Sequence, residues 1–286
     1  MNQEEEKVRA FYDQYGWVVK AGASGEDTLF RDFSPPYYPY HQRVIARTMA
    51  CFADLGGRLL VAGGGDMPES HVAIARQFSD VTCLDISKVA IDIARNKLGD
   101  RGEFVVGSIL DIPKSADYFD ASYCAHVIYH VDETQQGKAI RELIRVTKPG
   151  GRVVVIYNNP DSLPTRIARA KGKLPLVWKL KRKKPHARPD GTSRPPIYFF
   201  AHPLSWWSQF DDECEVEIRP WDVMGNLEEE AILIDDRIAT LGYKVCAWLE
   251  DKHPDKAARW WSYPLVILTK RQREQAGKPV STAATG

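Results

Sequence analysis

The sequence predicts a three-layer α/β/α fold with a seven-stranded, mostly parallel sheet and helical cap and insertion segments. Short apolar segments alternate with helix-like segments from residue 58 to residue 157, and this alternation is typical of βαβ units. The first apolar segment, residues 59–62, leads into Gly63, Gly64 and Gly65 and then into a segment with helical spacing. Glycines allow a sharp turn and let a ligand approach the backbone N–H groups at the start of a helix.

Each strand is predicted from a short run of apolar or β-branched residues. The run at 59–62 has apolar residues at successive positions, which is typical of a strand buried on both faces. The predicted strands lie at residues 58–62, 80–85, 103–107, 119–125, 152–157, 213–219 and 263–270. Apolar spacing, with glycine or proline at the ends, predicts helices at residues 4–15, 41–54, 69–78, 87–98, 133–146, 202–210 and 227–250.

Length and composition are those of an ordinary globular protein. The chain has 286 residues, 44% of them hydrophobic and 27% charged, and a net charge of +1. The start of the chain has no signal-peptide pattern, and no apolar run reaches the length of a membrane helix. The five cysteines are scattered and form no CxxC pair. We therefore expect no cysteine metal site and a cytoplasmic location.

A single domain is expected over residues 1–270. Its expected parts are an N-terminal helical cap (1–54), a ligand-binding core (55–160), a basic insertion (161–201), and C-terminal strands with a long helix (202–270). Residues 271–286 lack apolar periodicity and are expected to be disordered. The proline-dense segment 34–40 is expected to be irregular, serving either as packing or as a cover over a site.

Asp85 is the first candidate for ligand recognition. It ends the second predicted strand, 22 residues after Gly63, near the spacing at which an acid binds ribose hydroxyls in dinucleotide folds. The alternative role is a favourable interaction with the helix that follows. A nicotinamide-dependent oxidoreductase is the weaker nucleotide hypothesis, because Pro68 stands where glycine or alanine normally allows close helix packing.

A series of motifs in the same order resembles the class I, Rossmann-like S-adenosylmethionine-dependent methyltransferases of the small-molecule type. The resemblance covers residues 55–160 and rests most on the aspartate-ended second strand and Lys148-Pro-Gly-Gly151. The motifs are Leu59-Leu-Val-Ala-Gly-Gly-Gly65, Cys83-Leu-Asp-Ile-Ser87, Gly107-Ser-Ile-Leu-Asp-Ile-Pro113, Tyr118-Phe-Asp-Ala-Ser122, Val127-Ile-Tyr-His-Val131 and Arg145-Val-Thr-Lys-Pro-Gly-Gly151.

The resemblance implies a set of cofactor contacts for S-adenosylmethionine. The glycine loop (Gly63, Gly64 and Gly65) would pass under the methionine and ribose portion, and Asp85 would hold the ribose hydroxyls. The remaining implied contacts are Ile86 on the adenine, Ser108 and Ile109 at its edge, and His126 near the sulfonium. The sequence departs from the family pattern at Val61, Met67 and Ser108, where an acid, a glycine and an aspartate are usual.

Methyl transfer needs a positioned acceptor and, for a hydroxyl acceptor, a general base. His126 and His130 follow the fourth strand and are the candidate catalytic residues. Hydrogen bonding to the neighbouring loop is the alternative role of each. The candidates for lining the substrate pocket are Tyr12, Tyr15, Trp17, Tyr37, Tyr157 and Asn158. No metal site is expected.

The basic stretch 166–194 contains eleven Lys/Arg residues and one acid, Asp190. It is either a solvated insertion, a lid for a phosphate-bearing acceptor, or a peripheral contact with an anionic membrane. No nucleic-acid partner is expected, because no RNA-binding module accompanies the stretch. The long helix 227–250, with Ile234, Ile238, Leu241, Val245 and Trp248 as its apolar stripe, is expected to cover the pocket or to pair subunits in a homodimer.

The sequence thus predicts a methyltransferase that acts on a small molecule, with O-methylation of a sugar or natural-product intermediate as the expected reaction. Two alternatives stay open. One is the nicotinamide-dependent oxidoreductase, and the other is a non-catalytic protein that binds S-adenosylmethionine or associates with a membrane.

Overall fold

A seven-stranded sheet forms the centre of the protein. The computed structural model describes residues 3–16, 35–173, 197–225, 228–229, 232 and 235–272. The strand order is β3-β2-β1-β4-β5-β7-β6. Pairing is parallel from β3 through to β5 and antiparallel on both sides of β7, so the predicted mostly parallel sheet is confirmed. The strands are β1 (Arg58–Ala62), β2 (Asp80–Asp85), β3 (Gly102–Val106), β4 (Phe119–Ala125), β5 (Thr147–Ile156), β6 (Cys214–Asp222) and β7 (Tyr263–Lys270).

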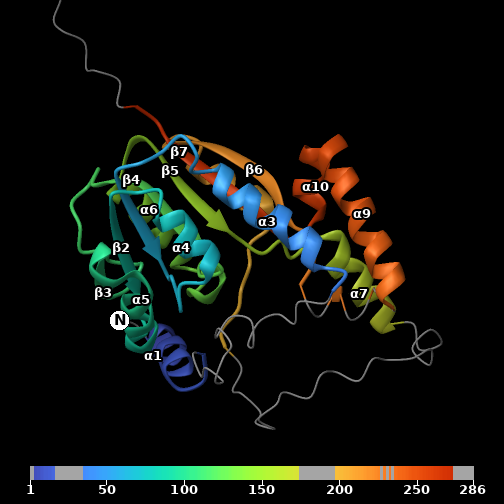
Figure 1. Cartoon of the computed structure of the whole chain (residues 1–286), viewed down its shortest axis with the longest axis horizontal. Helices are drawn as coiled ribbons and strands as arrows, with labels where there is room; N and C mark the ends of the chain where they lie inside the picture. The colour runs from blue at the N-terminus through green and yellow to red at the C-terminus, as the bar shows by residue number, and fades with distance from the viewer. Residues whose placement is uncertain are drawn as a thin grey trace, which may run out of the picture.

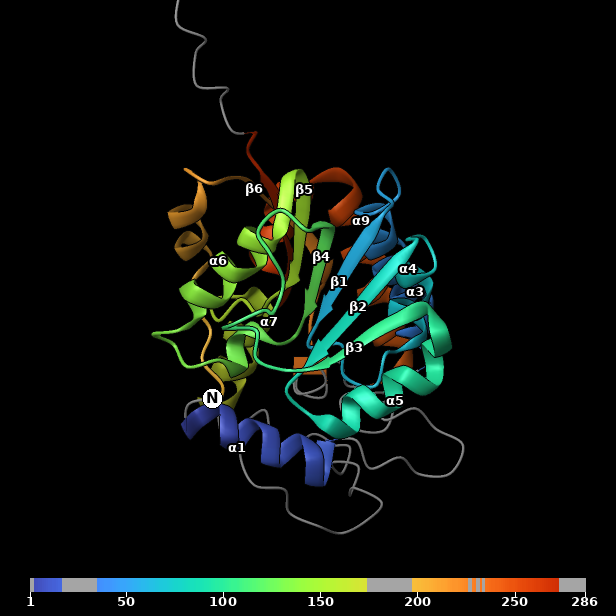
Figure 2. The ribbon, with the colours of Figure 1, turned by 90° about the vertical axis from the view of Figure 1, so that its left-hand side faces the viewer.

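Helices cover both faces of the sheet, as Figure 2 shows from the β3 edge. On one face lie α3 (Tyr38–Ala50), α4 (Glu69–Ala75) and α5 (Lys88–Leu98); on the other lies α6 (Gln136–Val146). The 3₁₀ helix η4 (Leu204–Phe210) packs on the same side as α6. This three-layer arrangement confirms the predicted fold class.

The residues of β1 show why the strand is apolar throughout. Leu59 and Val61 pack under α4 and α5, whereas Leu60 and Ala62 pack on the opposite side with α6. All four side chains are buried. Because successive residues of a strand point to opposite faces, a strand covered by helices on both sides needs apolar residues at every position.

The predicted ends of α5 are confirmed by its capping interactions. The Ser87 hydroxyl accepts a hydrogen bond from the Ala90 N–H over 3.2 Å, which satisfies one of the unpaired donors at the helix start. Gly99 follows the last helical residue with a φ of +58°, a conformation that favours glycine.

The N-terminal part differs from the prediction at two places. The expected helix 4–15 is an α-helix, α1 (Gln3–Phe11), followed by a π-helical segment, η1 (Tyr12–Gly16). The expected helix 41–54 runs instead over Tyr38–Ala50, so the proline-dense segment is partly helical. Pro39 is tolerated there because the first turn of a helix has no backbone bond for its missing N–H to make.

The C-terminal part contains two helices that were not predicted, α7 (Leu163–Lys173) and α10 (Pro254–Trp260). The predicted long helix includes α9 (Asp236–Lys252), and the described residues 228, 229 and 232 earlier in its predicted range are also helical. Figure 1 shows α9 and α10 on the side of the molecule away from β3 and α5.

The predicted apolar stripe of the long helix proves to be its outer face. Ile238, Leu241, Val245 and Trp248 are exposed. The inward face instead carries small and polar residues, including Ala239, Tyr243 and Glu250, because α9 packs against α3 through tyrosine rings. Ile234 lies outside the described residues.

Several predicted features lie beyond the part of the chain that the structure describes. They are residues 174–196 of the basic insertion, residues 273–286 of the expected disordered tail, and Trp17. Within the described residues, no helix has both the length and the apolar character to cross a membrane.

Candidate active site

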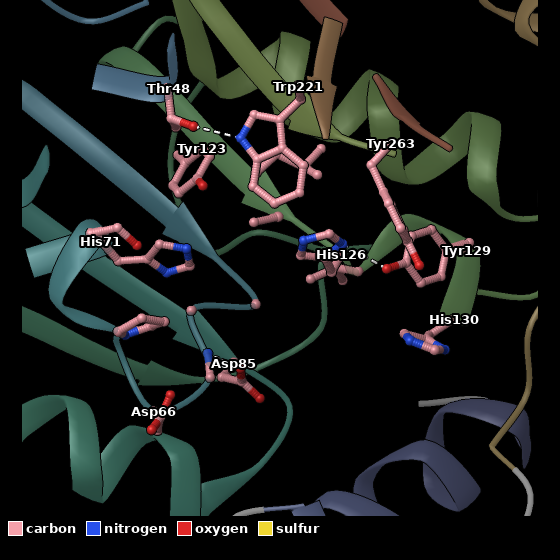
Figure 3. Close-up of a pocket in the computed structure, with 18 of the residues that line it drawn as sticks. Thr48, Asp66, His71, Asp85, Tyr123, His126, Tyr129, His130, Trp221 and Tyr263 are labelled. Atoms are coloured by element: carbon pink, nitrogen blue, oxygen red, sulfur yellow. Dashed lines mark hydrogen bonds between the residues drawn. The ribbon is translucent and has the colours of Figure 1, made fainter. Parts of the chain in front are cut away.

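A cavity of about 650 Å³ lies at the carboxyl ends of β1, β2 and β4. That volume is within the usual range for small-molecule sites. The structure brings eleven of the predicted site residues to its wall. These are Tyr12, Tyr37, Gly63, Gly64, Gly65, Asp85, Ile86, Ser108, Ile109, His126 and His130. Figure 3 shows how several of them surround the open centre.

The glycine loop after β1 can be built only with glycine at its first position. Gly63 has a φ of +68°, a value that costs other residues about 1–2 kcal/mol. A Cβ atom placed on Gly63 would lie 2.1 Å from Cγ2 of Val127. The loop therefore packs closely against the segment that follows β4, and both segments line the cavity.

Asp85 ends β2 inside the cavity wall and is buried. Its Oδ2 atom accepts a hydrogen bond from the Gly65 N–H at 3.0 Å, and its Oδ1 atom accepts one from the Ser87 N–H at 2.8 Å. Burial, with a smaller contribution from the negative charge of Asp13, raises the pKa of Asp85 to about 6 against the lowering effect of the backbone N–H donors. Each carboxylate oxygen can accept a second hydrogen bond, so the group can still receive two ligand hydroxyls.

Two departures from the family pattern, Val61 and Met67, belong to the core. Val61 is buried on the α4 and α5 side of β1, where it packs with Met67. Met67 is buried with a φ of +50°, in the left-handed region where a glycine is usual. Its side chain passes near Gly64, whose added Cβ would lie 3.2 Å from the Met67 sulfur. The loop is therefore supported from beneath by apolar packing.

The N-terminal segment covers the cavity near Asp85. Figure 2 shows α1 lying across the end of the sheet toward which β1 and β2 point. The Ser108 hydroxyl donates a hydrogen bond to Glu5, and the Ser87 hydroxyl donates one to Asp13 over 2.6 Å. Burial, together with the charge of Asp85, holds the pKa of Tyr12 well above its usual value. Polar contacts from α1 and η1 thus reach the segments that follow β3 and β2, on either side of the cavity near Asp85.

His126 follows β4 with a φ of +61°, which is unusual for a residue with a bulky side chain. Its Nδ1 atom lies 2.8 Å from the Tyr129 hydroxyl. The ring centroids of Trp221 and Tyr263 are 5.1 Å and 5.4 Å from that of His126. Strained backbone of this kind persists where surrounding contacts hold it, and such residues cluster at functional sites.

His130 ends the short 3₁₀ helix η3 (Ile128–His130). Its Nδ1 atom lies 2.7 Å from the carbonyl oxygen of Tyr198, so Nδ1 carries the proton that this carbonyl accepts. Burial lowers the pKa of His130. At neutral pH the imidazole is therefore neutral, and its Nε2 atom carries a lone pair.

A second group of lining residues, not predicted from the sequence, comes from elements far apart in the chain. These residues are Thr48, Asp66, His71, Lys97, Tyr123, Trp221, Asp222 and Tyr263. The Trp221 Nε1–H donates to the Thr48 hydroxyl over 2.8 Å, as Figure 3 shows. Only His71 left a signal in the sequence, as a histidine among the apolar residues of the helix after the glycine loop. Burial lowers its pKa to about 4.

Two predicted pocket residues, Tyr157 and Asn158, lie away from the cavity wall. Tyr157 is buried in the core, where its hydroxyl donates to Gln136 over 2.8 Å and accepts from the His202 N–H over 2.9 Å. The physical reason is that Tyr157 faces the α6 side of the sheet, with its ring against Trp207. Asn158 is half-buried and does not line the cavity. The Tyr15 side chain and all of Trp17 lie outside the described residues.

Comparison with known proteins identifies the central part of the chain. Residues 61–155 match the family described as "Methyltransferase domain". A demethylmenaquinone methyltransferase from Clavibacter sepedonicus is 34% identical over 163 residues, which cover 56% of this chain and 58% of that protein. The chain thus spans a little over half the length of this curated relative.

Solved structures show the same fold across more of the chain. Magnesium protoporphyrin IX methyltransferase from Synechocystis PCC 6803, solved with bound S-adenosylhomocysteine, covers 94% of this chain and all of that chain, with a TM-score of 0.55 and 13% identity. The [4+2]-cyclase SpnF covers 94% of this chain and 97% of that chain, with a TM-score of 0.55 and 17% identity.

These matches confirm the predicted class for the core of the chain. Residues 61–155 match a methyltransferase-domain family, and the described fold has the Rossmann-like architecture of the solved methyltransferase. The cavity, the glycine loop and Asp85 lie in or beside this domain. Within the described residues, no group of three or more histidine, cysteine or acidic side chains could hold a metal ion.

Proposed function

We propose that the protein transfers a methyl group from S-adenosylmethionine to a small-molecule acceptor. The observation that carries this proposal is the buried Asp85 carboxylate, which is held against the Gly65 N–H at the wall of a cavity of about 650 Å³. Such a carboxylate suits two vicinal ribose hydroxyls. The bound cofactor would supply an activated methyl group on a sulfonium, and the protein would supply position and exclusion of water.

The acceptor is proposed to be a natural-product intermediate with a planar ring. Aromatic side chains of Tyr123, Tyr129, Trp221 and Tyr263 line the cavity, and such faces favour stacking against flat ligands. The name of the Clavibacter relative refers to a quinone, which is consistent with this class. A sugar, whose apolar face can also lie on an aromatic ring, is the second candidate.

Charge in the cavity argues against the phosphate-bearing acceptor considered from the sequence. The described lining contains five acidic residues and one lysine. That lysine, Lys97, has its Nζ atom 3.6 Å from Asp66 and donates to the Met67 carbonyl oxygen over 3.0 Å. A phosphate there would meet an excess of acidic over basic side chains in the described lining. The acidic lining residues are Glu5, Asp66, Glu69, Asp85 and Asp222.

O-methylation is the proposed reaction, with different roles for the two histidines. His130 is neutral with a lone pair on Nε2, so it suits removal of a proton from an acceptor hydroxyl. Burial keeps the Tyr129 hydroxyl protonated, because it raises the pKa of that group. We infer that this hydroxyl donates to His126 Nδ1, leaving a proton on His126 Nε2 to orient the acceptor oxygen.

Cofactor binding can be tested by calorimetric titration with S-adenosylhomocysteine. We expect binding by the wild type and at least a tenfold loss of affinity in Asp85→Asn, because a carboxamide cannot accept at both positions. Asp80→Asn is the matched control, since Asp80 is exposed at the other end of the same strand. No heat with the wild type, or equal affinity in Asp85→Asn, would count against the proposal.

The acceptor can be sought by untargeted mass spectrometry of metabolites from the native host, incubated with the protein and S-adenosylmethionine. A gain of one CH₂ unit that requires His130 would support O-methylation, whereas a methyl group found on carbon would favour a quinone-type C-methylation. Binding of S-adenosylhomocysteine with no methylated product would favour the non-catalytic alternative. A parallel titration with NADH and NADPH tests the oxidoreductase alternative.

We also propose that the protein acts in the cytoplasm, because its five cysteines are scattered and form no CxxC pair.

A further inference from the structure

Four large apolar side chains form an exposed row along α9. Ile238, Leu241, Val245 and Trp248 have exposed fractions of 48%, 64%, 47% and 55%. Their spacing of three, four and three residues places them on one side of the helix. With a rise of about 1.5 Å per residue, the row is roughly 15 Å long. A continuous apolar surface of this kind on a soluble domain marks a contact with another molecule.

The polar residues around the row indicate a protein partner more than a membrane. Exposed neighbours on the same helix carry both signs, with Asp236, Arg237, Lys244, Asp251 and Lys252. Helices that lie on anionic membranes instead present a face rich in lysine and arginine. A mixed border of acids and bases is suited to a partner that also presents both charges.

The spacing of the row is the same when it is read in the opposite direction. About a midpoint at residue 243, position 238 corresponds to position 248, and position 241 to position 245. If two copies of α9 pack antiparallel about a two-fold axis at this midpoint, Ile238 contacts the second copy's tryptophan, and Leu241 contacts its valine. A two-fold interface requires this kind of self-complementary surface.

The charges at the two ends of the row are complementary in the same arrangement. Arg237 and Asp251 lie on the same side of the row at opposite ends of α9. Antiparallel packing therefore brings Arg237 of each copy near Asp251 of the other. Lys244 lies near the midpoint, and its two copies repel each other across the axis, which weakens the association.

From the surface, the spacing and the charges, we infer that α9 is a self-association helix and that the protein forms an antiparallel, two-fold homodimer through it. Four side chains cover less than the roughly 800 Å² per partner of a standard interface. The expected dimer is therefore weak, with a dissociation constant of about 1–100 µM. This inference does not depend on the proposed enzymatic function.

Sedimentation equilibrium over a range of concentrations of the full chain tests the inference. Leu241→Glu should weaken the dimer at least tenfold, because it places two charges in the apolar seam. Thr240→Glu is the matched control on the next position of the same helix, away from the row, and should change the constant less than threefold. Leu241 is largely exposed, so the fold should be unaffected, and circular dichroism would check this point.

A charge-exchange pair tests the antiparallel register. Ile238→Glu and Trp248→Lys should each weaken the dimer. The double variant should recover at least fivefold over either single variant, because each glutamate then faces a lysine of the second copy. Positions 238 and 248 are too far apart on one helix to pair within a chain. A wild type that stays monomeric at 200 µM (about twice the weakest expected constant), or a double variant weaker than both singles, would overturn the inference. Binding of the monomer to anionic vesicles, lost in Leu241→Glu, would assign the row to a membrane instead.

Discussion

Gly65 donates its backbone N–H to Oδ2 of Asp85 across 3.0 Å, so the residue that ends β2 also holds the loop that follows β1. The same carboxylate accepts from Ser87 at the start of α5. One buried acid thus positions two segments of the cavity wall. Burial disfavours the ionised carboxylate and raises the pKa of Asp85 to about 6. Cofactor affinity and the stability of the fold should therefore both depend on pH near this value.

Cofactor affinity should depend on pH through Asp85. The carboxylate accepts ribose hydroxyls only when ionised, so the affinity for S-adenosylhomocysteine should be about tenfold lower at pH 5 than at pH 7.5. Calorimetry at a series of pH values would measure this. Asp13→Asn should move the midpoint to lower pH, because the charge of Asp13 raises the pKa of Asp85. A wild-type affinity that is constant from pH 5 to pH 8 would contradict the assigned role.

The ligand-free protein should lose stability as Asp85 ionises. Its folded-state pKa of about 6 exceeds its ordinary value of 3.8, so the folded state binds more protons than the unfolded state between these values. Its contribution therefore falls as pH rises through this window, by about 1.4 kcal/mol per pH unit and about 2–3 kcal/mol in all. Urea unfolding of wild type and Asp85→Asn at pH 4 and pH 7.5 isolates the effect. The prediction is wrong if the difference between the two proteins is the same at both pH values.

Gly63→Ala should unfold the loop or the protein. The left-handed φ and the 2.1 Å approach to Val127 together cost about 3–4 kcal/mol. Gly64→Ala is the comparison, because its added Cβ would approach the Val61 side chain only to 3.1 Å, and we expect a cost below about 1 kcal/mol. Denaturant midpoints would show the order, and equal effects of the two changes would contradict the packing argument.

His130→Gln should lower the rate of methyl transfer by about 10² to 10⁴ and leave the affinity for S-adenosylhomocysteine within threefold of wild type. The wild-type rate should rise with pH and level off below the ordinary histidine pKa of about 6.5, because burial lowers the pKa of His130. His202→Gln is the control, since the His202 ring stacks on Trp206 outside the cavity. A full rate in His130→Gln would remove this residue from the proposed chemistry.

Glu250 should be important for stability although it lies outside the cavity. Its buried carboxylate accepts hydrogen bonds from Tyr40 and Arg47 of α3 and from the Trp261 indole. Glu250→Ala leaves Arg47 without its partner and should destabilise the protein by about 3–5 kcal/mol. Glu217→Ala removes the exposed pair with Arg219 and should cost less than about 1 kcal/mol. Thermal unfolding of both variants tests the contrast.

The cofactor side of the cavity could be predicted from the sequence because its residues are local. Gly63 follows one apolar strand and Asp85 ends the next. In a parallel sheet the carboxyl ends of neighbouring strands lie at the same edge, so the two residues were expected to lie close together. The start of α3 at Tyr38 was not predicted, because dense prolines usually indicate irregular structure. Pro39 is nevertheless compatible with the first turn of a helix. Which way the α9 stripe faces could not be predicted, because periodicity locates an apolar face without showing which face packs inward.

The acceptor side could not be predicted for a different physical reason. Thr48 and Trp221 are joined by a hydrogen bond across the cavity wall but are 173 positions apart. Tyr157, the last residue of the predicted strand 152–157, was expected in the pocket, yet a one-position change at the end of a strand moves a side chain to the other face of the sheet. Such placements depend on long-range packing, which no local pattern records.

The position of β7 has a consequence for synthesis on the ribosome. The last strand lies between β5 and β6, and both neighbours pair with it antiparallel. A nascent chain whose residues 263–270 are still in the exit tunnel can therefore assemble β3 to β5 but leaves β6 without its partner. During that interval the edge of β5 is open to other chains, so a cell that makes this protein must protect an incomplete sheet until residues 263–270 have left the tunnel.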